Sequence, residues 1–242
     1  MEKTKYTECY VAFLDMLGFK KLIEDSSCDE IAEIFTKHLK RRPLRGAYLG
    51  NEIFILKDTI NKLKAKVMSD SICFYIDVNV TNALLCIIMS CINFQYELYK
   101  NKIPIFIRGA IVRGHLYAEE DIIFGPGLTQ AYLMEENNAK YPRIILTKDT
   151  LKFLDEKNRK DNIDYATILE SIVFRDDDAF YTVNCMRVLW GSNQEIRENV
   201  ENRIKLMLDS TTDSSVREKY LYLEKWMQRE IHLSKIRNNP SS

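Results

Sequence analysis

The chain has 242 residues, and its 35 lysines and arginines balance its 35 aspartates and glutamates, so the formal net charge is zero. A protein that tracks nucleic acid or an acidic membrane needs a basic excess or a basic stripe, so this balance argues against both partners. Hydrophobic residues make up 46% and charged residues 29% of the chain, which is typical of a globular protein with a sizeable core rather than a disordered one.

The first half of the chain alternates apolar strand patterns with helical spacing. Asp15 ends the first strand abruptly, and the small polar residues Ser69 to Ser71 favour a tight turn between two later strands. In chain order we predict a strand at Tyr10 to Leu14, helical spacing from Phe19 to Leu39, a weak strand at Glu52 to Leu56, two paired strands between Lys66 and Asp77, and a long buried helix over Asn82 to Lys100.

The second half adds strands and then becomes helical. We predict a strand at Ile105 to Val112, a turn at Arg113 and Gly114 into His115 to Tyr117, a glycine loop at Phe124 to Gly127 that opens a helix through Glu135, a strand at Arg143 to Leu146, a short helix after Thr147, and a strand at Phe180 to Cys185. After about Trp190 two amphipathic helices follow, separated by Asp209 to Ser215, and Asn238 to Ser242 is predicted to fray.

This order predicts an α+β fold, a central mainly antiparallel sheet packed with helices. The change of character near Trp190 divides the chain into residues 1–188 and a C-terminal helical extension, residues 189–242. This extension is expected either to pack on the sheet or to extend a dimer contact.

Membrane and disulfide features are not predicted. No stretch supplies the about 20 consecutive apolar residues of a membrane span, and the charged segment Met1 to Glu8 argues against a signal peptide, so we expect a cytoplasmic protein. The six cysteines show no CxxC pair and no histidine at zinc-ligand spacing, which favours reduced buried thiols.

Two aspartates stand where sheet positions are normally apolar, Asp15 at the end of the first strand and Asp70 in the turn between the paired strands. Buried carboxylates are costly without a compensating cation, and two that converge form a good Mg²⁺ site. The turn Leu17, Gly18 and Phe19 at a helix start directs backbone N–H groups toward one place, where an anion such as a triphosphate can bind.

Each of these features also has a structural interpretation. Asp15 is equally consistent with a helix N-cap, and Asp70 with an ordinary turn residue. The acidic run Asp176 to Asp178 lacks the ligand spacing of a calcium loop and favours a hairpin turn. His115 follows Gly114 in a strand, which favours a structural or interface role over acid–base work.

Four segments occur in an order known from one protein family. Phe13 to Leu22 (FLDMLGFKKL) is similar to its first metal-binding segment, and Lys66 to Tyr75 (KVMSDSICFY) to the hairpin that carries its second metal aspartate. Phe106 to Tyr117 (FIRGAIVRGHLY) and Phe124 to Thr147 are similar to a strand with Arg-x-Gly and to a glycine loop with its helix and strand. Over about Tyr10 to Leu154 the chain therefore resembles the catalytic domain of class III nucleotidyl cyclases.

Within this family the chain is most similar to the bacterial pyrimidine cyclases of Pycsar antiphage defence. The resemblance implies a ferredoxin-like nucleotidyl cyclase fold over residues 1–188 and a homodimer with sites at the interface. It also implies conversion of a pyrimidine nucleoside triphosphate, UTP ahead of CTP, into cUMP or cCMP and pyrophosphate, and a separate effector that senses the product. Two Mg²⁺ or Mn²⁺ ions per site would be held by Asp15, Asp70 and the Met16 carbonyl.

The chain departs from this family in the helix after the glycine loop. Thr129 and Leu133 occupy the positions of an asparagine and of the arginine that stabilises the transition state, so the phosphate-binding cation has to come from elsewhere. By location, Arg108, Arg113 and Lys20 are candidates.

Base selection is assigned by the resemblance to the stretch Arg41 to Phe54, where Tyr48 would stack on or exclude a base. A tyrosine that packs a loop is an equally good interpretation. Two other functions stay open: a purine cyclase, and a catalytically silent module that binds nucleotide or dimerises.

Overall fold

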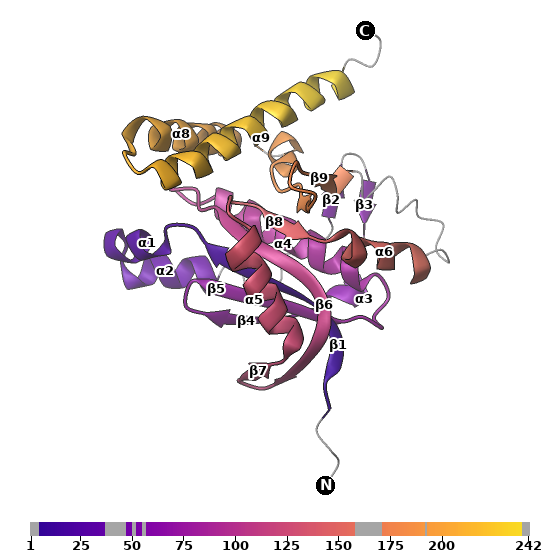
Figure 1. The fold of residues 1–242 in the computed structure, drawn as a ribbon. Helices are drawn as coiled ribbons and strands as arrows, with labels where there is room; N and C mark the ends of the chain where they lie inside the picture. Colours follow the sequence, from indigo (N-terminus) through magenta and orange to yellow (C-terminus); the bar gives the residue numbers. More distant parts are fainter. Residues whose placement is uncertain are drawn as a thin grey trace.

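One central sheet packed with helices forms the fold, as Figure 1 shows. The computed structural model describes residues 5–36, 47–49, 52–54, 57–157, 171–191 and 193–238. The sheet with helices packed on it confirms the predicted α+β class.

The strands of the central sheet lie in the order β4-β5-β1-β6-β8-β10-β9, with β7 paired to β6. Every pairing in it is antiparallel except that of β6 with β8, which confirms a mainly antiparallel sheet. Its strands are β1 (Thr7–Met16), β4 (Lys64–Met68), β5 (Ser71–Asp77), β6 (Ile107–Glu119), β7 (Ile122–Phe124), β8 (Ile144–Leu146), β9 (Val173–Arg175) and β10 (Tyr181–Val183). A separate hairpin pairs β2 (Ala47–Leu49) with β3 (Glu52–Phe54).

Helices cover both faces of the sheet. They are α1 (Phe19–Asp25), α2 (Cys28–Phe35), α3 (Lys57–Ile60), α4 (Ala83–Tyr99), α5 (Pro126–Asn138), α6 (Lys148–Lys157), α8 (Gln194–Ser210) and α9 (Ser214–Asn238), with a 3₁₀ turn η2 (Arg187–Gly191). Side chains alternate along β1, so that Ala12 and Leu14 face the core with α4 whereas Val11 and Phe13 face the core with α5. The long buried helix predicted over Asn82 to Lys100 is confirmed as α4.

The predicted turn at Arg113 and Gly114 is wrong, because β6 runs through both residues without a break. Gly114 serves a different purpose. A Cβ atom on it would lie 2.7 Å from the Cα atom of Gly127 in α5, so the glycine lets this helix approach the strand closely.

The helical spacing from Phe19 to Leu39 is divided into α1 and α2. Ser27 separates the two helices because it is the N-cap of α2. Its side chain accepts a hydrogen bond from the backbone N–H of Glu30, and the carboxylate of Glu30 accepts one from the backbone N–H of Ser27, which together form a capping box. The predicted end at Leu39 lies outside the described residues. Of the weak strand at Glu52 to Leu56, β3 covers Glu52–Phe54.

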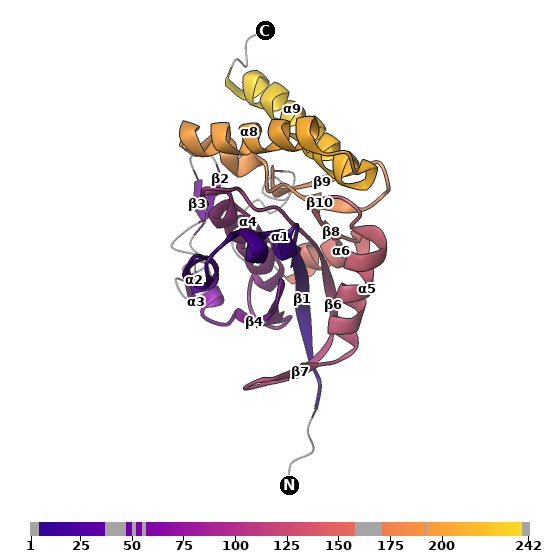
Figure 2. The ribbon, with the colours of Figure 1, turned by 90° about the vertical axis from the view of Figure 1, so that its left-hand side faces the viewer.

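The two C-terminal helices lie across the end of the sheet where β1 ends and β6 begins (Figures 1 and 2). Their apolar faces join the main core through Val200, Ile204, Tyr220 and Leu223. The helical extension thus packs on the sheet, as one of the two predicted arrangements requires. Asn238, predicted to begin the frayed tail, is the last residue of α9.

No helix in the described ranges is long and apolar enough to cross a membrane. The six cysteines are free, and all but the exposed Cys28 are buried. Burial raises the pKa of the Cys9 thiol to about 11 and that of Cys73 to about 12, which makes both poor nucleophiles.

Candidate active site

The carboxylate of Asp15 lies at the end of β1, between two neighbouring strands. In the register of the sheet Asp15 pairs with Ser71 of β5 and with Arg108 of β6, and its side chain is 19% exposed. It does not cap the following helix, since the N-cap of α1 is Gly18. The helix N-cap interpretation of Asp15 is therefore wrong.

Asp70 is brought to the same end of the sheet by the turn between β4 and β5. The N–H of Met16 donates to the carbonyl oxygen of Asp70 at 3.1 Å, which ties the end of β1 to this turn. The negative charge of Asp70 contributes to the raised pKa of the Asp15 carboxyl, after burial, the largest cause. The two aspartates thus share one site, and the side chain of Asp70 has no hydrogen-bond partner within the described ranges.

A partly buried ion-pair network joins Asp15 to α5 through Arg108. The Nε atom of Arg108 lies 3.0 Å from Oδ2 of Asp15 and 2.6 Å from Oε1 of Glu135 in α5. Glu135 is only 2% exposed, and burial raises the pKa of its carboxyl to about 7 against the opposing effect of Arg108. Arg108 therefore serves two carboxylates, and Glu135 positions it.

Sequence reasoning did not select Glu135, although a signal was present. Ala131, Met134 and Glu135 occupy the buried positions of α5, so a glutamate falls on the apolar face of an amphipathic pattern. A charged residue at such a position requires a buried partner, and here that partner is Arg108.

Glu135 makes stability depend on pH. Because its folded-state pKa of about 7 exceeds the ordinary 4.5, the folded chain binds this proton more tightly, and the free energy of unfolding falls as the pH rises through that range. The slope is at most about 1.4 kcal/mol per pH unit. We expect Glu135→Gln to flatten this slope in urea unfolding between about pH 5 and about pH 8. The exposed neighbour Glu136→Gln should retain it, and equal slopes in both variants would contradict the assignment.

Of the three backbone N–H groups in the predicted anion-binding turn, one is already hydrogen-bonded to the described part of the chain. Gly18 has φ of 76°, a left-handed conformation that starts α1, and its position is open enough that nothing lies within 4 Å of an added Cβ atom. The N–H of Leu17 donates to the carbonyl oxygen of Phe106 at 2.8 Å and is therefore committed. Those of Gly18 and Phe19 make no hydrogen bond within the described part of the chain. Lys20 follows them and is exposed.

Arg113 is not brought to the two aspartates. It pairs with Tyr10 in the register of β1, five residues before Asp15 and therefore about 16 Å along the strand. Its guanidinium binds the carboxylate of Glu8 through two hydrogen bonds of 2.8 and 2.9 Å. Tyr48 lies in β2, and its side chain is outside the described residues.

The donor set fits a divalent cation that also binds phosphate oxygens. Among the described residues no group of three or more His, Cys, Asp or Glu side chains could hold a metal ion. Mg²⁺, however, commonly uses one or two carboxylates together with water and substrate phosphates. Asp15 and Asp70 supply that number, and the partly buried carboxylate of Asp70, which has no hydrogen-bond partner among the described residues, has the charge that a cation would neutralise.

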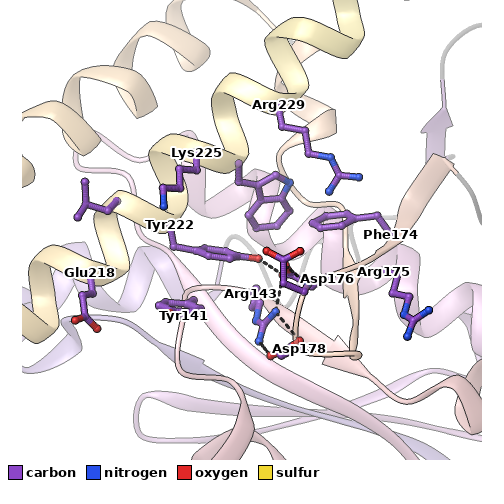
Figure 3. A pocket seen from close by; sticks show the side chains of 13 residues that line it. Tyr141, Arg143, Phe174, Arg175, Asp176, Asp178, Glu218, Tyr222, Lys225 and Arg229 are labelled. Carbon is purple, nitrogen blue, oxygen red and sulfur yellow. Dashed lines mark hydrogen bonds and ion pairs between the residues drawn. The ribbon is translucent and has the colours of Figure 1, made fainter.

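A second group of charged and aromatic residues lies around a cavity of about 870 Å³ between α9 and the β9–β10 hairpin (Figure 3). Arg143, which is 3% exposed, pairs with Asp176 and Asp178 at the hairpin turn. Its guanidinium also lies 5.7 and 5.6 Å from the ring centroids of Tyr141 and Tyr222. The prediction that Asp176 to Asp178 form a hairpin turn is confirmed.

This Arg143 cluster, Arg143 with Tyr141, Asp176, Asp178 and Tyr222, fastens α9 to the sheet. The rings of Tyr141 and Tyr222 stack at 4.6 Å with an interplanar angle of 2°. The hydroxyl of Tyr222 donates to Asp176 at 2.6 Å. Because Tyr222 belongs to α9 and its partners to the sheet side, these contacts fix the helix in place.

No protein-family model matches the chain, and no curated protein matches it. Among solved structures it is similar to the guanylyl cyclase domain of the RhoGC fusion protein from the aquatic fungus Blastocladiella emersonii (14% identity, 76% of this chain and 98% of that one, TM-score 0.49). It is also similar to the guanylate cyclase domain of RhGC from Catenaria anguillulae in complex with GTP (13%, 75% and 98%, 0.47) and to a bacterial light-regulated adenylyl cyclase (14%, 82% and 99%, 0.44). At these values the functional argument rests on the site itself.

Proposed function

We propose that the protein is a nucleotidyl cyclase, which converts a nucleoside triphosphate into a 3′,5′-cyclic mononucleotide and pyrophosphate. One observation carries the proposal: Asp15 at the end of β1 and Asp70 in the adjoining β4–β5 turn lie at the same sheet end as the Gly18 turn, two of whose N–H groups are unbonded among the described residues. Divalent ions bound there would neutralise the triphosphate and lower the pKa of the ribose 3′-hydroxyl. Residues 1–188 form the catalytic part in this proposal, and residues 189–242 extend it.

The residues of the chain position the reactants. Asp15 and Asp70, with the Met16 carbonyl, would hold the ions, while the N–H groups of Gly18 and Phe19 donate to a phosphate oxygen. The 3′-oxygen attacks the α-phosphorus as its proton leaves to solvent, and the bond to the β-phosphate oxygen breaks to release pyrophosphate. Such an in-line displacement requires alignment and charge stabilisation more than covalent help. Arg108, held by Glu135, keeps the Asp15 carboxylate oriented.

For the substrate we propose a pyrimidine triphosphate, UTP ahead of CTP, with cUMP or cCMP as a second messenger for a separate effector in Pycsar antiphage defence. The support is the similarity of Tyr10 to Lys20 (YVAFLDMLGFK) to the first segment of those cyclases. Purified protein incubated with Mn²⁺ and each of the four triphosphates, followed by mass analysis, tests this. Cyclic GMP or cyclic AMP as the main product would instead establish the purine alternative, and no pyrophosphate release with any triphosphate would establish the silent module.

We further propose a homodimer with the sites at its interface. Large apolar side chains are exposed on the N-terminal strand, the β6–β7 hairpin and α5: Tyr6 (50%), Ile122 (60%), Phe124 (47%), Tyr132 (43%) and Leu133 (46%). Tyr6, Phe124 and Leu133 also line one groove of about 870 Å³. Exposed apolar side chains gathered around a groove are typical of an interaction site.

Ile122→Asp tests the dimer. We expect light scattering to give a mass of twice 28.4 kDa for the unchanged protein and 28.4 kDa for the variant, with cyclase activity reduced at least about 10-fold, because a buried unpaired charge opposes association. Ile236→Asp, equally apolar and 53% exposed at the far end of α9, should stay dimeric. A monomeric unchanged protein with full activity would contradict the dimer.

A further inference from the structure

The first turns of α9 pack on Phe106, which precedes β6 beside the end of β1. The ring of Tyr220 packs edge-on against the ring of Phe106, with centroids 5.9 Å apart. Phe106 is also the residue whose carbonyl oxygen accepts from Leu17, immediately after the metal-binding segment. Tyr220 is buried at 5% exposure and bonded to Arg203 of α8, so this part of the helix is held firmly.

Lys219 precedes Tyr220 and is a half-buried cation. Within the described ranges its ammonium group takes part in no ion pair. Lys219 belongs to the turn of α9 that packs on Phe106 through Tyr220. A lysine that is partly buried near carboxylates without pairing to one is available to an anionic ligand.

The other candidate cations are less available to an anionic ligand. The Nε atom of Arg108 is shared by Asp15 and Glu135. Arg113 lies far along β6 and binds Glu8. Lys20 is exposed on α1, where water screens its charge. On α5, Leu133 offers no charge and is 46% exposed.

We propose that Lys219 is the residue that binds the β- and γ-phosphates of the triphosphate, so that the C-terminal helices complete the active site. The inference rests on the proposed function for the identity of the substrate. Three contacts carry it: the packing of Tyr220 on Phe106, the hydrogen bond from Leu17 to Phe106, and the fastening of Tyr222, one turn further along α9, by the Arg143 cluster. Lys219 thus supplies a cation that α5 lacks.

The test compares ligands that differ only in phosphate number. Calorimetry with Mg²⁺ would measure binding of the non-cleavable α,β-methylene analogues of UTP and ATP and of the corresponding monophosphates. For the preferred base, Lys219→Ala should weaken binding of the triphosphate analogue about 10- to 100-fold, as expected for loss of a charge-assisted contact, and change monophosphate binding less than about 2-fold. Lys219→Arg should restore most of the loss, because it keeps the charge.

The matched control is Lys235→Ala, on the same helix about 24 Å further along and exposed, which should leave binding of both ligands unchanged. Thermal unfolding of each variant checks the fold, and Lys219→Met serves if Lys219→Ala is unstable. Unchanged triphosphate binding in both neutral variants would overturn the role of Lys219, as would equal weakening of both ligands.

The two proposals fail separately. If the unchanged protein binds the triphosphate analogue but forms no cyclic product from any triphosphate, the cyclase proposal fails while the binding role of Lys219 is still measured. If cyclic product forms equally well in Lys219→Ala with an unchanged KM, the Lys219 proposal fails alone. If the unchanged protein binds no triphosphate analogue, both are overturned.

Discussion

Replacing Asp70 by alanine should abolish formation of cyclic nucleotide and leave a folded dimer. The carboxylate has no partner within the described residues, so its removal costs the fold little, whereas it leaves Asp15 as the sole carboxylate ligand. Because divalent ions contribute several kcal/mol to stabilisation of the transition-state charge, we expect the rate to fall at least about 100-fold. Cyclic product quantified by mass spectrometry at saturating Mn²⁺ is the measurement.

Asp70→Asn keeps the shape of the side chain and should be nearly as inactive, which separates charge from packing. Asp149→Asn, at an exposed position in α6 where the aspartate pairs with Lys152, removes one negative charge elsewhere and should be fully active. Cyclase activity that survives in either Asp70 variant would show that the ions, if bound, are held by other groups.

Replacing Arg143 by methionine should have the largest effect on stability. Its guanidinium is buried, and its loss leaves Asp176 and Asp178 without their cation, so we expect the free energy of unfolding to fall by about 3–5 kcal/mol. Arg143→Lys should restore only part of this loss, because an ammonium group neither forks between two carboxylates nor offers a planar cation beside the rings of Tyr141 and Tyr222. Urea unfolding followed by circular dichroism measures both variants.

The exposed Arg175, on the same hairpin, provides the control, and Arg175→Met should change stability by less than about 0.5 kcal/mol. Hydrogen exchange should show loss of protection in α9 first in the Arg143 variant, since Tyr222 joins that helix to the cluster. A stability loss without any change in α9 would mean that the cluster does not fasten this helix.

Local patterns predicted most of the fold because each element carries its own signal. The apolar run of β1, the all-round hydrophobicity of α4 and the spacing of Val200, Ile204 and Leu208 in α8 are such signals. Two predictions about turns and helix ends were wrong for physical reasons. Gly114 is a turn signal in sequence, yet its purpose depends on α5, which is distant in the chain. Ser27 looks like any polar helix residue until Glu30 completes a capping box.

The candidate site was predictable only where strand ends impose proximity. Asp15 and Asp70 could be paired because an unexpected carboxylate at a strand end and another in a hairpin turn share one sheet edge. Glu135 and Lys219 come from α5 and α9, and nothing in their neighbouring residues reveals which part of the sheet these helices cover. Arg113 shows the converse. It is only five residues from Arg108 in sequence, but because β6 is extended it lies far from the two aspartates.

The contact between Gly114 and Gly127 sets how far the α5 axis stands from the sheet. A methyl group on either residue would push the two backbones apart and withdraw Glu135 from Arg108, although neither glycine touches a charged atom. The geometry of the acidic centre is therefore governed by the spacing of two main chains at the opposite end of the helix. The outward surface of α5, where Thr129 and Leu133 lie, takes no part in that spacing.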